Sequence, residues 1–235
     1  MTLYGRLATV YRMVPEPARR WTLEHMPDRL LALRQRALVR LEQRADRQEL
    51  YDDWYYDNVV DPLMRASADT IATALERELR PQTVIDIGCG TGALMLALER
   101  RGVRCLGFDA AEPALDRCRR RGLTVRPLDI GRDPVPPDRA DLVVSTEVAE
   151  HLPEHAADRF VDLLCALAPV VVLTAARPGS SGKDHVNLQP NEYWIEKFDA
   201  RGLAYDRELA LRLREEWRAA GVDEAFFATL MVFRR

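Results

Sequence analysis

The sequence predicts an α/β fold in which helices cover both faces of a mainly parallel β-sheet. From residue 81 onward, β-branched apolar runs alternate with amphipathic helical stretches, and this alternation is typical of parallel sheets. Acidic residues follow the predicted strands at their carboxyl ends, which is where ligands bind in sheets of this kind. The two observations together predict one binding edge along the sheet.

Length and composition limit what the protein can be. The 235 residues suit one α/β domain of about 180 residues with an accessory segment. We therefore expect a helical cap or lid over residues 1–80 and a ligand-binding domain over residues 81–235. A hydrophobic fraction of 47% argues against disorder, and a net charge of −3 argues against a general nucleic-acid binder.

Cysteine usage and hydropathy bear on the compartment. The four cysteines lack metal-type spacing, so we expect them to be reduced and buried. No apolar run reaches about 18 residues, and the N-terminal residues lack the apolar core of a signal peptide. We expect a cytoplasmic protein without membrane attachment, and nothing in the sequence indicates its oligomeric state.

The first 80 residues carry the least regular pattern. Pro15 and Pro17 interrupt any long helix near the start, whereas residues 28–49 are predicted to form a covering helix. Four aromatic residues alternate with acids over residues 51–57, which fits either a pocket wall or ordinary packing. A helix is expected over residues 61–79. The many arginines, scattered along the predicted helices, are interpreted as a coding bias.

Residues 84–92 organise the predicted domain. Asp86 lies inside a buried strand, which is followed by a turn that contains Gly88, Gly90 and Gly92. Glycine is needed where backbone approaches a ligand closely or adopts positive φ. The spacing differs from the dinucleotide fingerprint, and no Walker-type lysine follows, so nicotinamide dinucleotides and nucleoside triphosphates are disfavoured.

The remaining elements follow in regular order. Further strands are predicted at residues 103–108, 123–128, 140–145, 170–175, 203–205 and 225–233. Helices are predicted at residues 93–101, 112–121, 155–167, 191–200 and 207–220. Gly102 and Gly122 mark two helix ends, because glycine readily adopts the left-handed conformation that ends a helix.

Two acids after consecutive strands each have two interpretations. Asp109 could accept hydrogen bonds from ribose hydroxyls, or it could cap the following helix. Asp129 could accept from an adenine amino group beside the backbone of Ile130, or it could be a turn residue before Gly131. Both interpretations of each acid stay open at the level of the sequence.

The motifs resemble those of class I S-adenosylmethionine (SAM) methyltransferases. The resemblance rests on Ile-Asp-Ile-Gly-Cys-Gly-Thr-Gly at 85–92, Gly-Phe-Asp at 107–109, Leu-Asp-Ile at 128–130 and Ser-Thr-Glu-Val-Ala-Glu-His-Leu-Pro at 145–153. It implies a seven-stranded Rossmann-like sheet with a reversed last strand, and SAM as the cofactor. It also implies cofactor contacts from Asp86, Gly88, Gly90, Asp109, Ala110, Asp129, Ile130 and Glu147. Residues 184–194 more loosely resemble a loop and helix of small-molecule methyltransferases from actinobacterial biosynthetic clusters.

Four residues are candidates for the chemistry. Methyl transfer from a sulfonium is a displacement in which the enzyme mainly aligns the reacting atoms, and a hydroxyl acceptor also benefits from a general base. His151 and His185 suit that role at neutral pH, although His151 also fits a cap of the following helix. Tyr55 and Tyr56 are candidates because aromatic faces attract a sulfonium cation.

The sequence predicts no metal, but one alternative stays open. Glu147, Glu150, His151 and His185 are similar to the metal-binding set of small-RNA 2′-O-methyltransferases and ubiquinone-pathway O-methyltransferases. Two carboxylates and two imidazoles could hold a divalent ion that lowers the pKa of an acceptor hydroxyl. Glu147, however, is also expected near the cofactor.

The expected function is SAM-dependent methyl transfer to a hydroxyl or amine of a small metabolite. One alternative is a SAM-using enzyme that transfers another alkyl group, or closes a ring, and releases methylthioadenosine. The aromatic run at residues 54–56 motivates it, because a crowded lid could enclose SAM alone. A further alternative is a non-catalytic SAM-binding partner. The acceptor itself is not indicated by any motif.

Overall fold

The computed structural model describes residues 3–15, 17–18, 25–27, 29–30, 37, 51–180 and 182–235. The helix expected over residues 28–49 therefore lies largely outside the described residues. Contacts divide the chain into two units. The first comprises residues 1–52 and 181–185, and the second comprises residues 53–180 and 186–235. The boundary predicted at residue 80 stays a prediction.

The first unit contains helix α1 and a short contact around Tyr51. Helix α1, Leu3–Met13, ends shortly before Pro15, as the prolines of this region predict. The hydroxyl of Tyr51 donates to Oδ2 of Asp184 at 3.3 Å, and the ammonium nitrogen of Lys183 lies 5.7 Å from the centroid of the Tyr51 ring. These contacts join residues 183–184 to the end of the N-terminal segment within this unit.

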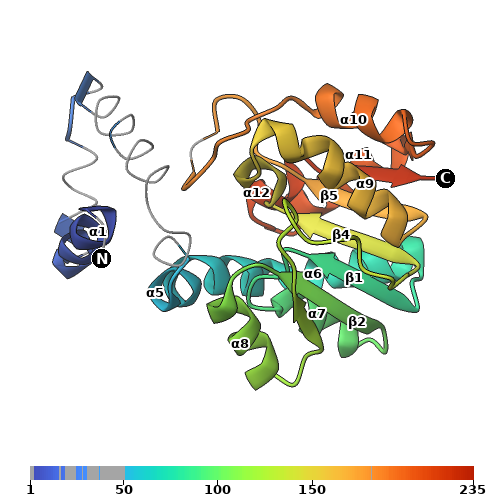
Figure 1. The fold of residues 1–235 in the computed structure, drawn as a ribbon, viewed down its shortest axis with the longest axis horizontal. Coiled ribbons are helices and arrows are strands. Elements are labelled where there is room, and N and C mark those ends of the chain that lie inside the picture. The colour runs from blue at the N-terminus through green and yellow to red at the C-terminus, as the bar shows by residue number, and fades with distance from the viewer. Residues whose placement is uncertain are drawn as a thin grey trace. The chain divides into compact units, whose positions relative to one another are not determined.

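The second unit is built on one sheet (Figure 1). Within the described residues, seven strands run in the order β3-β2-β1-β4-β5-β7-β6. Their bounds are β1 Thr83–Ile87, β2 Arg104–Asp109, β3 Val125–Pro127, β4 Leu142–Thr146, β5 Val170–Thr174, β6 Ala204–Tyr205 and β7 Met231–Arg234. Strands β1 to β5 pair in parallel, whereas β7 is antiparallel to both β5 and β6. The predicted mainly parallel sheet with a reversed last strand is confirmed.

Helices cover both faces of this sheet. They are α5 Asp53–Tyr55, the π-helix η1 Tyr56–Val60, α6 Asp61–Leu79, α7 Ala93–Glu99, α8 Glu112–Arg120, α9 Ala157–Leu167, α10 Asn191–Asp199, α11 Arg207–Ala219 and α12 Glu224–Phe227, with 3-10 turns η2 Ala149–His151 and η3 Glu154–Ala156. Residues of α6, α7 and α11 belong to one buried apolar cluster, which includes Val84 of β1. Residues of α9 and α10 belong to a second, which includes Ile85. Neighbouring residues of β1 thus face opposite layers, as the pleat of a strand requires.

The strand predicted over residues 225–233 is wrong in its first half. That part forms helix α12, and only Met231–Arg234 pair in the sheet. Asp223 caps α12 by accepting from the N–H of Ala225 at 3.0 Å, and Phe226 is buried. A side-chain cap and one buried aromatic residue therefore outweigh the strand propensity of this short apolar run.

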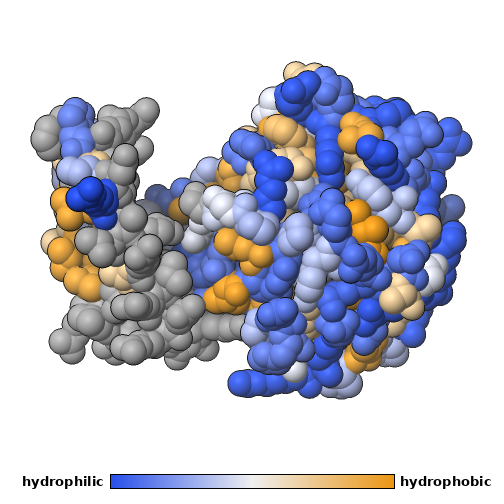
Figure 2. Space-filling model, turned by 90° about the horizontal axis from the view of Figure 1, so that it is seen from above, coloured by the Kyte–Doolittle hydropathy of each residue, from blue (hydrophilic) through white to orange (hydrophobic). Residues whose placement is uncertain are grey.

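The surface of the second unit is mostly hydrophilic on the face drawn in Figure 2, with small apolar spots among the polar residues. Of the helices in the described part of the chain, none combines the length and apolar composition that a bilayer crossing requires. All four cysteines are buried, as predicted.

Candidate active site

The turn between β1 and α7 brings backbone to the carboxyl ends of the central strands. Gly88 and Gly90 have φ of +76° and +52°, in the left-handed region that glycine adopts readily. A Cβ on Gly88 would lie 2.2 Å from Cγ2 of Val148, whereas one on Gly90 would lie 3.5 Å from Cγ1 of Val60. The N–H of Gly88 donates to the carbonyl oxygen of Phe108 at 2.7 Å, which joins the turn to β2. Glycine is therefore required at residue 88 by conformation and by space together.

Asp109 ends β2 and borders this turn. Its Oδ2 accepts from the N–H of Gly90 and its Oδ1 from the N–H of Ala111, both at 2.9 Å. Burial raises the pKa of the Asp109 carboxyl, while the N–H donors of Ala111, Gly90 and Ala110 lower it. The N-cap position of α8 is Ala111 and not Asp109, so the capping interpretation of Asp109 is wrong. Its carboxylate connects the glycine turn to the segment before α8.

Asp86 lies inside β1 and is 4% exposed. Burial, and after it the negative charge of Asp109, raise the pKa of Asp86 to about 7. A buried acid beside a half-buried one favours a ligand that brings positive charge or hydrogen-bond donors. The ammonium group and the ribose hydroxyls of SAM have that chemistry, so the residues present fit this cofactor.

Asp129 follows β3 in an irregular loop. Its Oδ1 accepts from the N–H of Gly131 at 2.9 Å, and its N–H donates to Oδ2 of Asp133 at 2.7 Å. The interpretation of Asp129 as a turn residue is therefore confirmed. Ile130 packs against the second apolar cluster, and its carbonyl oxygen accepts from Nε of Arg159 at 2.7 Å. Contact of these two residues with an adenine ring stays a prediction.

The turn after β4 holds a carboxyl pair. Glu147 has φ of +55°, an uncommon conformation for a residue with a side chain. The hydroxyl of Thr174 accepts from the N–H of Glu147 at 3.0 Å and donates to its Oε1 at 2.9 Å. Burial, and after it the charge of Glu147, raise the pKa of the fully buried Glu150. Burial therefore favours the neutral form of Glu150, since the charged form is the costlier one to bury.

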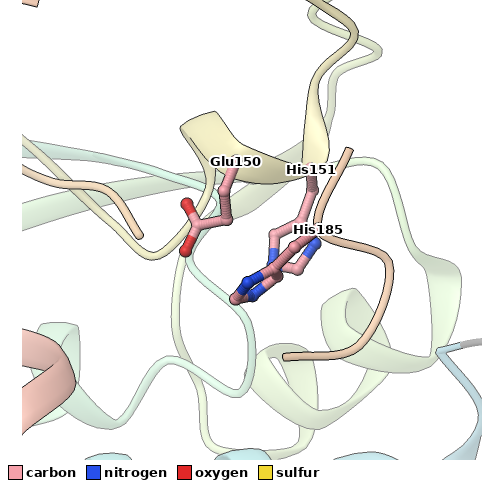
Figure 3. A group of neighbouring side chains, drawn as sticks. All are labelled: Glu150, His151 and His185. Atoms are coloured by element: carbon pink, nitrogen blue, oxygen red, sulfur yellow. The ribbon is translucent and has the colours of Figure 1, made fainter. Parts of the chain in front are cut away.

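The loop before α10 joins the turn after β4 through backbone. The N–H groups of Val186 and Asn187 donate to the carbonyl oxygen of Glu150 at 2.9 and 3.0 Å. One ligand atom from each of Glu150, His151 and His185 lies within 4.8 Å of the others, and Figure 3 shows these three side chains.

His151 and His185, unlike Glu147, belong to the group of side chains that could bind a cation. Burial lowers the pKa of His185, which keeps its imidazole neutral near pH 7. His151 is half-buried and follows Glu150 in the turn η2. Neutral imidazoles can accept a proton or bind a cation. Glu147 is outside the group of possible cation ligands found among the described residues, so the predicted set of four is only partly brought together.

Tyr56 lies at the glycine turn, and Tyr55 packs against it. The two rings meet edge to face with centroids 6.0 Å apart. Tyr56 is 4% exposed. Burial, and after it the negative charge of Asp109, raise the pKa of its hydroxyl. The aromatic run therefore supplies one residue to the cofactor edge, and Tyr55 is only half-buried.

Two contacts at this edge were missed in the sequence. Asp61 accepts from the hydroxyl of Thr91 at 2.6 Å and from Nη2 of Arg121 at 2.8 Å, which joins the start of α6 to the glycine turn. Arg117 is buried on α8 and pairs with Asp53 and Asp57. One signal was available, because Arg117 stands at helical spacing from the apolar residues of α8. Arginine on an apolar helix face is unusual and calls for partners.

Residues 62–221, more than half of the chain, match the sequence pattern of the methyltransferase domain family. The chain belongs to this family. The resemblance drawn from the four motifs is thereby confirmed for the fold and the family. The matched range contains the glycine turn, all the predicted acids and both candidate histidines, whereas Tyr55 and Tyr56 precede it.

Sequence relatives cover a limited part of the chain. Over 85 residues it is 35% identical to the ubiquinone biosynthesis O-methyltransferase of Methylococcus capsulatus, a match that covers 33% of this chain and 36% of the relative. The chain thus spans about a third of the length of that relative.

Solved structures show the same fold at low identity. An O-methyltransferase family protein from Burkholderia thailandensis superposes with a TM-score of 0.65 at 15% identity, over 88% of this chain and 70% of that one. The magnesium protoporphyrin IX methyltransferase of Synechocystis PCC 6803 with bound SAH superposes with a TM-score of 0.53 at 18% identity, over 64% of this chain and 80% of that one.

Proposed function

We propose that this protein transfers the methyl group of SAM to a hydroxyl or amine of a small metabolite. The observation that carries the proposal is the pair of buried Asp86 and half-buried Asp109 at a turn of positive-φ glycines, on the edge of the sheet where such folds bind ligands. Membership of the methyltransferase domain family supports the same conclusion. Bound SAM would supply an electrophilic methyl group on a sulfonium.

The cofactor residues have separate roles in this proposal. Asp86 binds the ammonium group, and Asp109 accepts hydrogen bonds from the ribose. Gly88 and Gly90 let the backbone approach the cofactor closely. Ala110, Asp129 and Ile130 contact its nucleoside. Glu147, held by Thr174, borders the amino acid part.

On the acceptor side, His151 and His185 orient the acceptor and accept its proton. The lowered pKa of His185 supports this role, because a neutral imidazole is the form that can act as a base. Tyr55 and Tyr56 would flank the sulfonium through their ring faces.

Isothermal titration with SAM and with S-adenosylhomocysteine (SAH) tests the cofactor. We expect both to bind with one site per chain, and the failure of both to bind would end the proposal. Incubation with SAM and a panel of hydroxyl and amine metabolites, followed by mass spectrometry, then identifies the acceptor. SAH is the expected second product.

Substitution of the histidines tests the acceptor side. His151→Ala and His185→Ala should each lower kcat by about 100-fold with SAH affinity unchanged, as expected for loss of a general base. His155→Ala is the matched control, because His155 is exposed in the neighbouring turn η3. Full activity of both histidine variants would contradict this role, and tight SAM binding with no turnover of any acceptor would favour a non-catalytic binding partner.

A second candidate function has its own support. Tyr56 is buried at the cofactor edge, and a lid of this kind could enclose SAM without an acceptor. Alkyl transfer or ring closure would then release methylthioadenosine. Detection of methylthioadenosine, with no SAH formed, would replace the methyl-transfer proposal with this one.

A divalent ion is a variant of the main proposal. Glu150, His151 and His185 offer three ligand atoms, although Glu150 would have to release its proton first. Activity before and after chelation, with Mg²⁺, Mn²⁺ or Zn²⁺ restored, separates this variant from the metal-free reaction that we expect. We also infer a cytoplasmic protein whose partner is a small molecule and not nucleic acid, which cell fractionation and nucleic-acid binding assays test.

A further inference from the structure

Arg117 is a buried cation that the proposed chemistry does not use. It lies on α8 between Leu115 and Cys118 and is 7% exposed. A buried guanidinium destabilises the fold unless every N–H finds a partner. Among the described residues it donates five hydrogen bonds, which matches the five donors of the group. All the N–H donors of the Arg117 guanidinium are therefore satisfied only while these partners are in place.

Four of those five bonds reach the segment formed by α5 and η1. Asp53 accepts through Oδ1 at 2.6 Å and through its carbonyl oxygen at 3.0 Å. Oδ1 of Asp57 accepts from Nε at 3.0 Å and from Nη2 at 2.8 Å. The fifth bond goes to the carbonyl oxygen of Pro113 at 2.9 Å, within the segment of α8 itself. Figure 1 shows α5 beside α8, where these bonds form.

The segment held in this way covers the cofactor edge. The Arg117 guanidinium carbon lies 5.5 Å from the centroid of the Tyr56 ring. The negative charge of Asp109 contributes to the raised pKa of the Tyr56 hydroxyl. At the other end of η1, Cγ1 of Val60 would lie 3.5 Å from a Cβ on Gly90. Both Tyr56 and Val60 belong to the π-helix η1, a conformation that often marks functional sites. Tyr56 and Val60, the two ends of η1, therefore lie on the side of the segment that faces the glycine turn.

The two sides of the contact between Arg117 and the segment 53–60 differ in exposure. The Arg117 side chain is 8% exposed, whereas the side chains of Asp53 and Asp57 are 78% and 62% exposed. When the lid lifts, water can solvate the two aspartates at once. The cost of opening therefore falls on Arg117, which would lose four of its five partners in a partly apolar place. Because only Arg117 loses partners that water does not replace, its separation from Asp53 and Asp57 is the step that opens the segment.

We propose that Arg117 is a positioning residue that latches the segment 53–60 closed over the cofactor, and that its separation from Asp53 and Asp57 admits and releases the cofactor. The latch rests on the proposed function, because it assumes that SAM or SAH binds beneath Tyr56. It acts through the lid and touches neither the methyl group nor the acceptor.

The test substitutes the exposed side of the latch. In the full-length protein, Asp53→Asn with Asp57→Asn keeps an oxygen acceptor for Arg117 at each position, so the melting temperature should stay close to that of the wild type. We expect about tenfold faster SAH release in stopped-flow displacement, because loss of a partner from a buried charge pair acts mainly on dissociation. Amide hydrogen exchange should rise in residues 53–60 and stay unchanged in β1. Salt should speed SAH release from the wild type and have less effect on the double variant.

Two further variants make the test specific. Arg117→Lys keeps the charge with fewer donors and should give an intermediate release rate. Arg119→Ala is the matched control, because it removes the same charge from α8 but its partners Glu112 and Asp116 are exposed. It should release SAH at the wild-type rate.

The outcomes separate the two proposals. If the double variant binds SAH but shows wild-type release and wild-type exchange in residues 53–60, the latch is wrong and the proposed function stands. If the wild type binds neither SAM nor SAH, the proposed function fails, together with the latch as a gate for this cofactor. Hydrogen exchange of the ligand-free double variant would still show whether Arg117 holds the segment, and unchanged exchange there contradicts the latch itself.

Discussion

The turns after β1 and β4 border the same edge of the sheet and are built in different ways. After β1, positive φ is adopted by glycines, and the turn is held by backbone bonds to β2. After β4, positive φ is imposed on Glu147, a conformation that costs roughly 1–2 kcal/mol in a residue with a Cβ. Its two hydrogen bonds with Thr174 offset that cost.

The difference shows how the two halves of a site are specified. The β1 turn needs glycine and one acid nearby, which a short motif can supply. The β4 turn needs partners from β5 and from the loop at residues 186–187, which no local pattern contains. We therefore expect single substitutions in the turn after β1 to cause large losses of SAH affinity. Single substitutions in the turn after β4 should cause smaller losses.

The largest effect is expected for Gly88→Ala. The new Cβ would meet Val148 at 2.2 Å, so the turn must move, and we expect SAH affinity to fall at least about 100-fold with a loss of about 2 kcal/mol in the free energy of unfolding. Gly122→Ala is the control, since Gly122 has φ of +77° but no atom within 4 Å of the added Cβ. Calorimetry of both variants measures the difference, and equal loss of SAH affinity in the two would show that strain alone is responsible.

Asp109→Asn should have the next largest effect. The amide keeps the shape of the carboxylate but turns an acceptor into a donor opposite the N–H of Gly90 or Ala111. We expect SAH affinity to fall about 30-fold, which corresponds to about 2 kcal/mol. Asp116→Asn on the exposed face of α8 is the control. Unchanged SAH binding by Asp109→Asn would contradict the assignment of the ribose hydroxyls to Asp109.

Asp86 predicts a dependence of SAH binding on pH. Its pKa is raised to about 7, and a bound ammonium group favours the charged carboxylate, so affinity should increase about tenfold from about pH 6 to about pH 8. Asp86→Asn should show a flat profile. A wild-type profile that is flat over this range would contradict the assignment of the ammonium group to Asp86.

The same raised pKa acts on stability in the opposite direction. Without ligand, the folded protein keeps a proton on Asp86 up to about pH 7, whereas the unfolded carboxyl releases it near about pH 4. The free energy of unfolding should therefore fall as pH rises between these values. Chemical denaturation across this range, with Asp86→Asn as reference, measures the contribution.

The smallest effect is expected for Glu150→Gln. Since burial favours the neutral form of Glu150, a neutral amide of the same size should be tolerated, and the free energy of unfolding should change by less than about 1 kcal/mol. Glu150→Ala should lose about 3 kcal/mol, because it leaves a cavity at a fully buried position. If Glu150→Gln is as unstable as Glu150→Ala, then Glu150 is charged in the folded protein.

How far the sequence could go is visible in particular residues. Helix α6 was predicted with its observed bounds, since Asp61-Pro62 and the turn before Pro81 are local signals. Asp109 was placed at the binding edge, because the end of a parallel strand fixes its position. The strand over residues 225–233 failed at Asp223, where a side-chain cap decided for a helix. Arg117 was dismissed with the other arginines, since its partners lie 60 and 64 residues away.

The sequence by itself determined the sheet, the glycine turn and the acids inside β1, at the end of β2 and after β3. These depend on side-chain periodicity and on the conformational freedom of glycine, which are properties of short segments. Only the tertiary structure brought Tyr56, Asp53 and Asp57 to Arg117, and the loop at residues 186–187 to Glu150. Each of these is a contact between distant segments, and it exists because a buried polar group must find a partner wherever the fold provides one.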